Sequence, residues 1–269
     1  MTNELPEDPL AGMKIAITGG TSGLGLALVR ELISRGAEVA FVARGRERVE
    51  RIAHGNKGTH GIVGDVSIKE DIHPIAIQIV GALGGLDVLV NNASDLGPVP
   101  LELLGDTPCE DLERAFATNV LGPFRLTKAL LGALASSARE GHGGVVVNVS
   151  SDAALTPYPR WGAYGTSKAA LHHLSQIWDA ELGGDGIRFV SFDPGDMDTP
   201  LHALAVPDAD TSELKRPEMA ARELADVIAG VLSGRRRDGC AQDEALKESP
   251  YDGSQVAHSS SRGREVAGR

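Results

Sequence analysis

The fold of this protein is decided by residues 18–25, which read TGGTSGLG. They join an apolar run, Met13–Thr18, to a segment in which apolar residues recur at helical spacing, Leu24–Ser34. Glycines here allow a tight turn and a close approach of the backbone, and the free N–H groups that begin a helix attract a pyrophosphate. A Gly-rich loop can also be a purely structural turn, but its place between a first strand and a helix predicts a dinucleotide site.

Short apolar runs alternate with amphipathic segments along the rest of the chain. The runs are rich in Val and Ile and nearly continuous, which is typical of strands buried on both faces of a parallel sheet. They are Met13–Thr18, Glu38–Val42, Thr59–Val63, Leu86–Val90, Val145–Val149 and Ile187–Phe192. Helical spacing follows each of them, in Leu24–Ser34, Arg46–Ala53, Lys69–Gly81, Glu110–Ala135, Tyr164–Leu182 and Pro217–Leu232. This alternation predicts a single α/β domain, a three-layer doubly wound Rossmann-type parallel sheet.

The composition excludes several classes of protein. The 269 residues are 42% hydrophobic and carry a formal net charge of −11, which argues against a general nucleic-acid binder because such a protein needs a basic surface. No apolar run is long enough to cross a bilayer and the acidic N-terminus does not resemble a signal peptide, so we expect a cytoplasmic protein without a membrane partner. Cys109 and Cys240 cannot form a disulfide framework, and the scattered histidines lack metal-ligand spacing, so no metal site is predicted.

Five further motifs follow the Gly-rich turn in chain order. They are Asn91-Asn92-Ala93-Ser94 after the fourth strand, Asn119 in the long helical segment, Ser151 at the end of the fifth strand, Tyr164 with Lys168 as Y-x-x-x-K, and Pro194–Thr199 after the sixth strand. Together with the G-x-x-x-G-x-G spacing of the turn, they resemble the motifs of the short-chain dehydrogenase/reductase family over residues 13 to about 233. The family has N-N-A-G where this chain has N-N-A-S.

The resemblance implies that the chain binds a nicotinamide dinucleotide. The residues expected to contact the cofactor are Thr18, Gly19, Thr21, Ser22, Gly23, Leu24, Gly25, Arg44, Asp65, Val66, Asn92, Ala93, Tyr164, Lys168, Pro194, Gly195, Met197 and Thr199. Asp65 and Val66 match the family's position beside the adenine ring, although Asp65 can also serve only as a cap for the next helix. Thr199 is expected at the nicotinamide carboxamide, or else belongs to a plain Asp-Thr-Pro turn.

The end of the second strand indicates which nicotinamide cofactor is preferred. An acid there would bind the ribose 2′-hydroxyl of NAD(H) and repel a 2′-phosphate, but the sequence has Ala43 followed by Arg44. A guanidinium can pair with a phosphate dianion, so we expect NADP(H), with NAD(H) less favoured. The alternative is that Arg44 is a solvated surface residue, like Arg46 and Arg48 beside it.

Tyr164 and Lys168 point to proton transfer. A tyrosine hydroxyl has an ordinary pKa of about 10, and a cation one helical turn away stabilises the tyrosinate and lowers that value. Ser151 is expected to donate a hydrogen bond to the substrate oxygen. As the resemblance implies, Lys168 also holds the nicotinamide ribose and Asn119 positions a water that relays protons to Lys168. Taken alone, the Tyr–Lys pair can also be a surface pair on an amphipathic helix.

These motifs predict an oxidoreductase that reduces a ketone or aldehyde to an alcohol, or the reverse, with Tyr164 as acid and base. Its partner is a small-molecule carbonyl or alcohol, held between Asp95–Leu104 and Pro200–Arg216, with Tyr158, Arg160, Trp161 and His202 nearby. One alternative is an NAD-dependent alcohol dehydrogenase of the same fold. Another is a non-catalytic dinucleotide sensor or scaffold, which would usually have lost the Tyr or the Lys.

Three segments are expected along the chain. Residues 1–12 form an N-terminal extension, residues 13–234 the Rossmann-type catalytic domain, and residues 235–269 a polar, mobile C-terminal tail with almost no aliphatic residues. Members of the family usually end with a seventh apolar strand, which this tail does not contain. The resemblance also implies a homodimer or homotetramer assembled through the long helical segments Glu110–Ala135 and Tyr164–Leu182.

Overall fold

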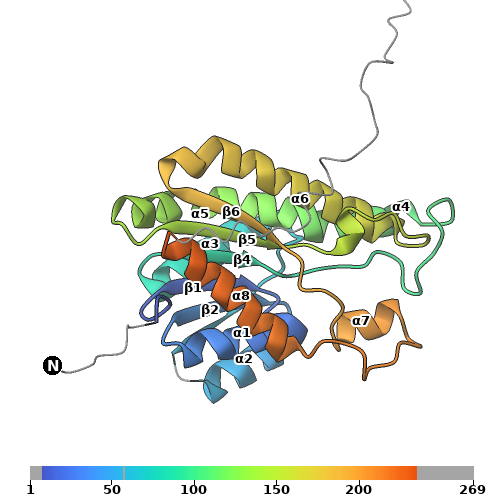
Figure 1. The fold of residues 1–269 in the computed structure, drawn as a ribbon, viewed down its shortest axis with the longest axis horizontal. Helices are drawn as coiled ribbons and strands as arrows, with labels where there is room; N and C mark the ends of the chain where they lie inside the picture. Colours follow the sequence, from blue (N-terminus) through green and yellow to red (C-terminus); the bar gives the residue numbers. More distant parts are fainter. Residues whose placement is uncertain (1–7, 57, 235–269) are drawn as a thin grey trace, which may run out of the picture. The chain divides into compact units, whose positions relative to one another are not determined.

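The structure, a computed structural model, describes residues 8–56 and 58–234 and shows one parallel six-stranded sheet (Figure 1). The strand order is β3-β2-β1-β4-β5-β6. The strands are β1 Lys14–Thr18, β2 Glu38–Ala43, β3 Thr59–Val63, β4 Val88–Asn91, β5 Gly144–Val149 and β6 Ile187–Phe192. The predicted fold class is therefore confirmed. The fourth strand begins at Val88 rather than at the predicted Leu86.

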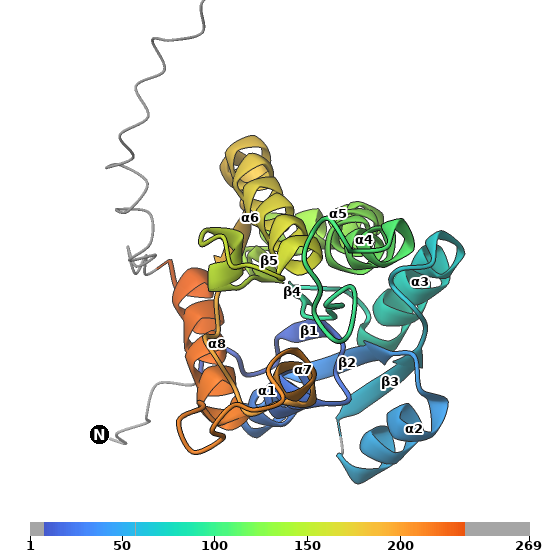
Figure 2. The ribbon, with the colours of Figure 1, turned by 90° about the vertical axis from the view of Figure 1, so that its right-hand side faces the viewer.

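Helices cover both faces of this sheet and complete the three layers (Figures 1 and 2). They are α1 Gly23–Ser34, α2 Arg46–Gly55, α3 Ile72–Leu83, α4 Cys109–Phe116, α5 Gly122–Arg139, α6 Gly162–Leu182, α7 Pro200–Ala205 and α8 Pro217–Leu232. Short 3₁₀ turns occur at Lys69–Asp71, Asp152–Ala154 and Gly183–Asp185. Within the described residues, no helix is long and apolar enough to cross a membrane.

Each face of the sheet buries its own apolar cluster. Helices α1, α2 and α8 contribute to the first cluster, in which Phe41 and Leu28 are fully buried, and the described end of the N-terminal segment adds Leu10 to it. Helices α3, α5 and α6 cover the opposite face, where Ile79 and Leu126 are fully buried. Because both faces are covered, the inner strands β1, β2, β4 and β5 are nearly continuous apolar runs rather than alternating ones.

The sheet reverses its order at β1, which lies between β2 and β4. The register pairs Ile17 of β1 with Val90 of β4, so the segments that leave these two strands emerge side by side. In open α/β sheets, ligands bind in the crevice at such a reversal, outside the carboxyl ends of the strands. The Gly-rich turn after β1 and the Asn92-Ala93-Ser94 segment after β4 both belong to this edge.

The structure differs from the sequence prediction in the long helical segment Glu110–Ala135. Helix α4 and helix α5 are separated there by a π turn, Ala117–Leu121. Pro123 explains the break, because it has no N–H to donate to the carbonyl of Asn119 four residues earlier. The prediction of one continuous helix was therefore wrong, and Asn119 lies in the π turn. Such turns are frequent at functional sites.

A second difference concerns the segment after β6, where no helix was expected before Pro217. Helix α7 forms there because Pro200 occupies its first turn and the Thr199 hydroxyl accepts a 3.2 Å hydrogen bond from the His202 amide. The predictions made for residues 235–269 lie outside the residues that the structure describes.

Candidate active site

A cavity of about 1200 Å³ lies at the carboxyl edge of the sheet. Its lining comes from the Gly-rich turn, the ends of β2, β4, β5 and β6, and the α7 region. The predicted cofactor-binding and catalytic residues line this cavity, apart from Thr18 and Asn119. Residues more than a hundred positions apart in the chain are thus brought to one site.

The Gly-rich turn packs so tightly that side chains are excluded from it. A Cβ on Gly25 would lie 2.2 Å from the Gly19 carbonyl oxygen, and Gly19 itself has a φ of +73°. Ser22 precedes α1 without making a side-chain cap, so no side chain caps the first amides of this helix. A close-packed turn followed by uncapped helix amides provides an anion site.

Hydrogen bonds of Thr18 and Asn92 stabilise the Gly-rich turn. The Thr18 hydroxyl accepts hydrogen bonds of 3.0 Å from the backbone amides of Asn92 and of Ala93. The side-chain amide of Asn92 donates in return to the carbonyl of Thr18, at 2.9 Å, and to that of Gly19, at 3.3 Å. These four bonds join the end of β4 to the turn after β1, so the two residues shape the floor of the site.

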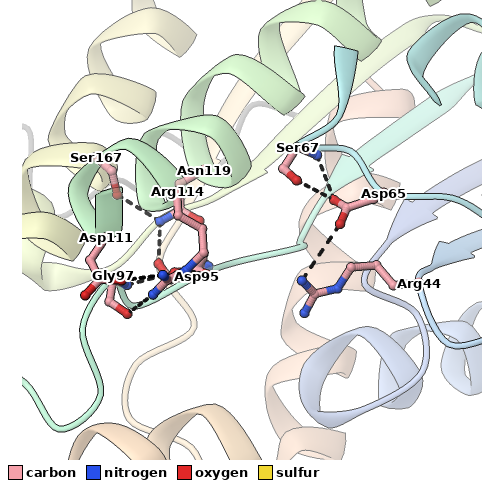
Figure 3. Close-up of polar contacts among 9 residues, drawn as sticks. All are labelled: Arg44, Asp65, Ser67, Asp95, Gly97, Asp111, Arg114, Asn119 and Ser167. Atoms are coloured by element: carbon pink, nitrogen blue, oxygen red, sulfur yellow. Dashed lines mark hydrogen bonds and ion pairs between the residues drawn. The ribbon is translucent and has the colours of Figure 1, made fainter. Parts of the chain in front are cut away.

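Arg44 and Asp65 lie at another part of the cavity lining (Figure 3). The Arg44 side chain is 75% exposed, and its Nη1 atom lies 3.8 Å from Oδ2 of Asp65. Asp65 also accepts hydrogen bonds from the amide and the hydroxyl of Ser67, at 2.9 and 2.7 Å, so it closes a turn and does not cap the helical segment that follows. Arg46, Arg48 and Arg51 line the cavity as well. This part of the lining is therefore rich in guanidinium groups.

Tyr164 and Lys168 are both buried on α6 and face the same cavity. Burial raises the pKa of the Tyr164 phenol to about 12, the opposite of the fall expected from a neighbouring cation, although the hydroxyls of Ser151 and Ser94 oppose that rise. Burial likewise lowers the pKa of Lys168 to about 8, and only the negative charge of Asp193 opposes that fall. The Lys168 ammonium donates a 2.7 Å hydrogen bond to the Val149 carbonyl. The two groups therefore belong to the site, which excludes the reading as a surface pair.

Two buried amide–hydroxyl bonds hold α6 in register. Asn148 of β5 donates to the Ser175 hydroxyl at 2.9 Å, and Asn119 donates to the Ser167 hydroxyl at 2.8 Å. These contacts lie on either side of Lys168 along the helix. Since buried polar groups are costly unless paired, they specify one position of α6 against the sheet and the π turn.

Asn119 does not line the cavity, and its side chain is occupied by its neighbours (Figure 3). Its amide nitrogen donates to the Asp95 carbonyl and to Ser167, and its amide oxygen accepts from the Asp95 amide at 2.8 Å. Arg114 of α4 binds the same loop through the Asp95 carboxylate and the Gly97 carbonyl, and it also pairs with Asp111. The side chain of Asn119 therefore ties the segment after β4 to α6.

Ser151 and its neighbours form the far wall of the site. The Ser151 hydroxyl donates a 3.0 Å hydrogen bond to Asp152, whose other carboxylate oxygen accepts one of 2.7 Å from Tyr158. Trp161 packs edge-on against Tyr164, with ring centroids 5.6 Å apart. Leu96, Ala153 and Tyr164 form a small apolar cluster on which Leu101, Leu201 and Ala205 also pack. Tyr158, Trp161 and His202 line the cavity as predicted, and Arg160 is not among its lining residues.

Ser94 was not predicted from the sequence. It lines the cavity, and its hydroxyl opposes the rise in the pKa of the Tyr164 phenol. The signal that could have found it is the serine that stands where the family motif has glycine. Asp152 and Asp193 were also missed, and both lie close enough to raise the pKa of Tyr164.

Comparison with known proteins agrees with this geometry. The family model for short chain dehydrogenase matches residues 13–210. An uncharacterized oxidoreductase of Mycobacterium tuberculosis is 36% identical over 237 residues, which cover 86% of this chain and 67% of the relative.

Two solved structures have the same fold. A 3-ketoacyl-(acyl-carrier-protein) reductase from Brucella melitensis, complexed with NADH, has a TM-score of 0.75 and 26% identity, over 83% of this chain and 91% of the other. An alcohol dehydrogenase from Thermococcus sibiricus, complexed with 5-hydroxy-NADP, has a TM-score of 0.70 and 28% identity, over 80% and 90%. On the family match and the shared architecture, this chain belongs to the short-chain dehydrogenase family and is an oxidoreductase.

Proposed function

We propose that this protein is an NADP(H)-dependent oxidoreductase that interconverts a ketone or aldehyde and the corresponding alcohol. The observation that carries the proposal is the burial of Tyr164 and Lys168 together in the cavity that also contains the Gly-rich turn. One part of the cavity is suited to a dinucleotide and another to proton transfer. A bound nicotinamide supplies the hydride that this chemistry requires.

The cavity fits a dinucleotide in two respects. The glycines of the turn have no side chains, so α1 packs closely against the end of β4. Because no side chain covers the first amides of α1, a pyrophosphate can approach them. Thr21, Ser22 and Gly23 line the cavity at this turn, and Thr199 contacts the Gly23 position from the other side. Solved relatives complexed with NADH and with 5-hydroxy-NADP support a nicotinamide cofactor of either phosphorylation state.

The guanidinium groups support NADP(H) over NAD(H). Ala43 stands where an acid would repel a 2′-phosphate. The contact of the next residue, Arg44, with Asp65, at 3.8 Å, is longer than a good hydrogen bond. The guanidinium therefore keeps donors for a phosphate. The Asp65 carboxylate lies beside the Arg44 guanidinium. The same carboxylate accepts hydrogen bonds from the amide and hydroxyl of Ser67, which close the turn after Asp65.

In the reduction direction, Tyr164 donates its phenolic proton to the substrate oxygen as the carbon receives hydride. Lys168 lies beside the ring as a cation and stabilises the tyrosinate that remains. Ser151 turns its hydroxyl from Asp152 to the substrate oxygen, where negative charge develops. Asn119 acts through its backbone, since Pro123 leaves its carbonyl without the usual helical donor and able to hold a water for proton relay to Lys168.

The test is a screen for NADPH oxidation over ketones, quinones, oxoacyl thioesters and sugars, run with the wild type and with Tyr164→Phe. Turnover by the wild type alone supports the proposal. An NAD-dependent alcohol dehydrogenase would instead bind NADH about tenfold more tightly than NADPH in fluorescence titrations. Tight NADPH binding without turnover of any compound would favour the sensor or scaffold.

A further inference from the structure

The carboxylate of Asp152 lies one hydrogen bond away from the hydroxyl of Ser151. Its Oδ1 atom accepts a 3.0 Å hydrogen bond from that hydroxyl, and its Oδ2 atom accepts one of 2.7 Å from the hydroxyl of Tyr158. Tyr158 therefore holds one carboxylate oxygen in place and leaves the other directed at Ser151. All three residues line the cavity, so the carboxylate is within reach of a bound substrate.

Substrate binding takes the Ser151 donor away from Oδ1 of Asp152. In the proposed function the Ser151 hydroxyl turns to the substrate oxygen, and a carboxylate that loses a hydrogen bond in a filled cavity needs another donor. Oδ1 then lies within about 6 Å of the substrate oxygen, the reach of two successive hydrogen bonds. A donor on the carbon next to the reacting carbonyl is close enough to replace the Ser151 hydroxyl.

A second carboxylate makes this end of the cavity negative. Asp152 follows β5 and Asp193 follows β6, and these two strands pair in a register that sets Val149 opposite Phe192. Burial contributes most to the raised pKa of the Tyr164 phenol, and the charges of both carboxylates add to that rise. Their charges therefore reach the catalytic oxygen, where an anionic substrate would be repelled and a cationic one attracted.

The cations that line the cavity lie away from Asp152 or have partners of their own. The lining arginines all belong to the segment after β2, which is three strands from β5 in the sheet, or about 14 Å. The Lys168 ammonium donates to the Val149 carbonyl at 2.7 Å, and His202 faces Asp196 at 3.8 Å. A carboxylate or phosphate on the substrate would therefore meet carboxylates here rather than arginines.

We propose that Asp152 is a specificity-determining residue that accepts a hydrogen bond from the substrate, so that the substrates are ketones with a hydroxyl or an ammonium group on the carbon next to the carbonyl. The inference rests on the proposed function, which directs the Ser151 hydroxyl to the substrate oxygen. A hydroxyl and an ammonium group share the donor that Asp152 requires, and neither is repelled by its charge. Keto acids and phosphorylated ketones are disfavoured for the opposite reason.

The proposal is tested by binding to the complex of the full-length protein with NADP⁺, which carries no hydride and cannot reduce a ketone. The probes are acetophenone, its two derivatives with a hydroxyl or an ammonium group on the methyl carbon, and benzoylformate, which has a carboxylate there. Calorimetric titration in slightly acidic solution, where the amine is protonated, gives the four dissociation constants.

The hydroxy ketone or the amino ketone should bind at least about tenfold more tightly than acetophenone, the effect of one hydrogen bond to a charged group. The tighter binder of the two identifies the donor. Benzoylformate should bind more weakly than acetophenone, because its carboxylate is repelled.

Asp152→Asn removes the charge, keeps an oxygen for Tyr158, and should abolish most of the preference for the hydroxy or amino ketone. Asp196→Asn is the matched control, since it makes the same change to a carboxylate of the cavity that faces His202 instead of Ser151. It should retain the preference.

The proposal would be overturned if the wild type lacked the preference, if Asp152→Asn retained it, or if both variants lost it equally. Tightest binding by benzoylformate would overturn it as well. The titration needs no turnover, so its failure is distinct from a failure of the proposed function, which would appear as a lack of NADPH oxidation in the screen.

Discussion

Lys168 places its ammonium 5.4 Å from the centroid of the Tyr164 ring and donates a 2.7 Å hydrogen bond to the Val149 carbonyl. Both side chains are buried, with 2% and 8% of their surfaces exposed. Burial favours the neutral form of each group, so the pKa of the lysine falls to about 8 and that of the tyrosine rises to about 12. A buried ammonium or a buried tyrosinate is therefore unfavourable by itself. When both are present, their opposite charges stabilise each other and lower that cost.

Tyr164→Phe should abolish turnover of any substrate that the screen identifies. Loss of a positioned general acid costs roughly 10²- to 10⁴-fold in rate, because the phenyl ring can neither donate nor accept the proton. NADPH binding, measured by fluorescence titration, should stay close to that of the wild type. Tyr158→Phe is the control, since it makes the same change to a second tyrosine of the cavity. Equal rate losses in the two variants would contradict the role of Tyr164.

Lys168→Met should stabilise the fold while removing activity. The pKa of Lys168 is lowered by burial from 10.5 to about 8, so the unfolded chain binds the proton more tightly. The free-energy cost of burying the charged ammonium in the folded state is about 3 kcal/mol. It is fully present below about pH 8 and fades as the pH rises toward 10.5. Loss of the bond to Val149 offsets about 1 kcal/mol of the gain.

Denaturant unfolding at several pH values measures this effect. The variant should be about 2 kcal/mol more stable than the wild type at neutral pH, with the difference shrinking in alkaline solution. Lys128→Met, at an exposed position of α5, should show no such pH dependence. A Lys168→Met protein that is less stable at every pH would show that the buried ammonium stabilises the fold.

Arg44→Ala should weaken NADPH binding about tenfold and leave NADH binding nearly unchanged, because the guanidinium pairs with the 2′-phosphate alone. Fluorescence titrations with both cofactors measure the two dissociation constants. Arg46→Ala is the control from the same segment: it removes a second guanidinium of the cavity lining and should weaken NADPH binding less than Arg44→Ala does. Equal losses for NADH and NADPH in Arg44→Ala would mean that Arg44 does not discriminate between the cofactors.

Asn119→Ala should destabilise the protein by about 2 to 4 kcal/mol. It removes three hydrogen bonds at once and leaves the Asp95 amide, the Asp95 carbonyl and the Ser167 hydroxyl without this partner. Gln78→Ala removes an exposed side-chain amide that donates one bond, and it should cost less than about 0.5 kcal/mol. Thermal unfolding measures both, and equal effects would contradict the bridging role of Asn119.

The sequence predicted the sheet well because the signals of its strands and turns are local. Thr59–Val63 and Ile187–Phe192 have the predicted bounds, since each contains β-branched or aromatic residues and is bounded by polar or Gly residues. The long helix was predicted less well. Its apolar spacing continues through Asn119, and the break depends on a proline whose effect competes with the surrounding helical pattern. Helix α7 was missed because six residues are too few for periodicity to show.

The sequence by itself determined the alternation of strands and helices, the Gly-rich turn, and the one-turn spacing that puts Tyr164 and Lys168 on the same face of a helix. Only the tertiary structure decided that Arg44 lies near Asp65 and that Asn119 binds Asp95 and Ser167. The reason is that spacing along a helix or strand follows from backbone geometry, whereas contacts between distant residues depend on how the strands are ordered and the helices packed.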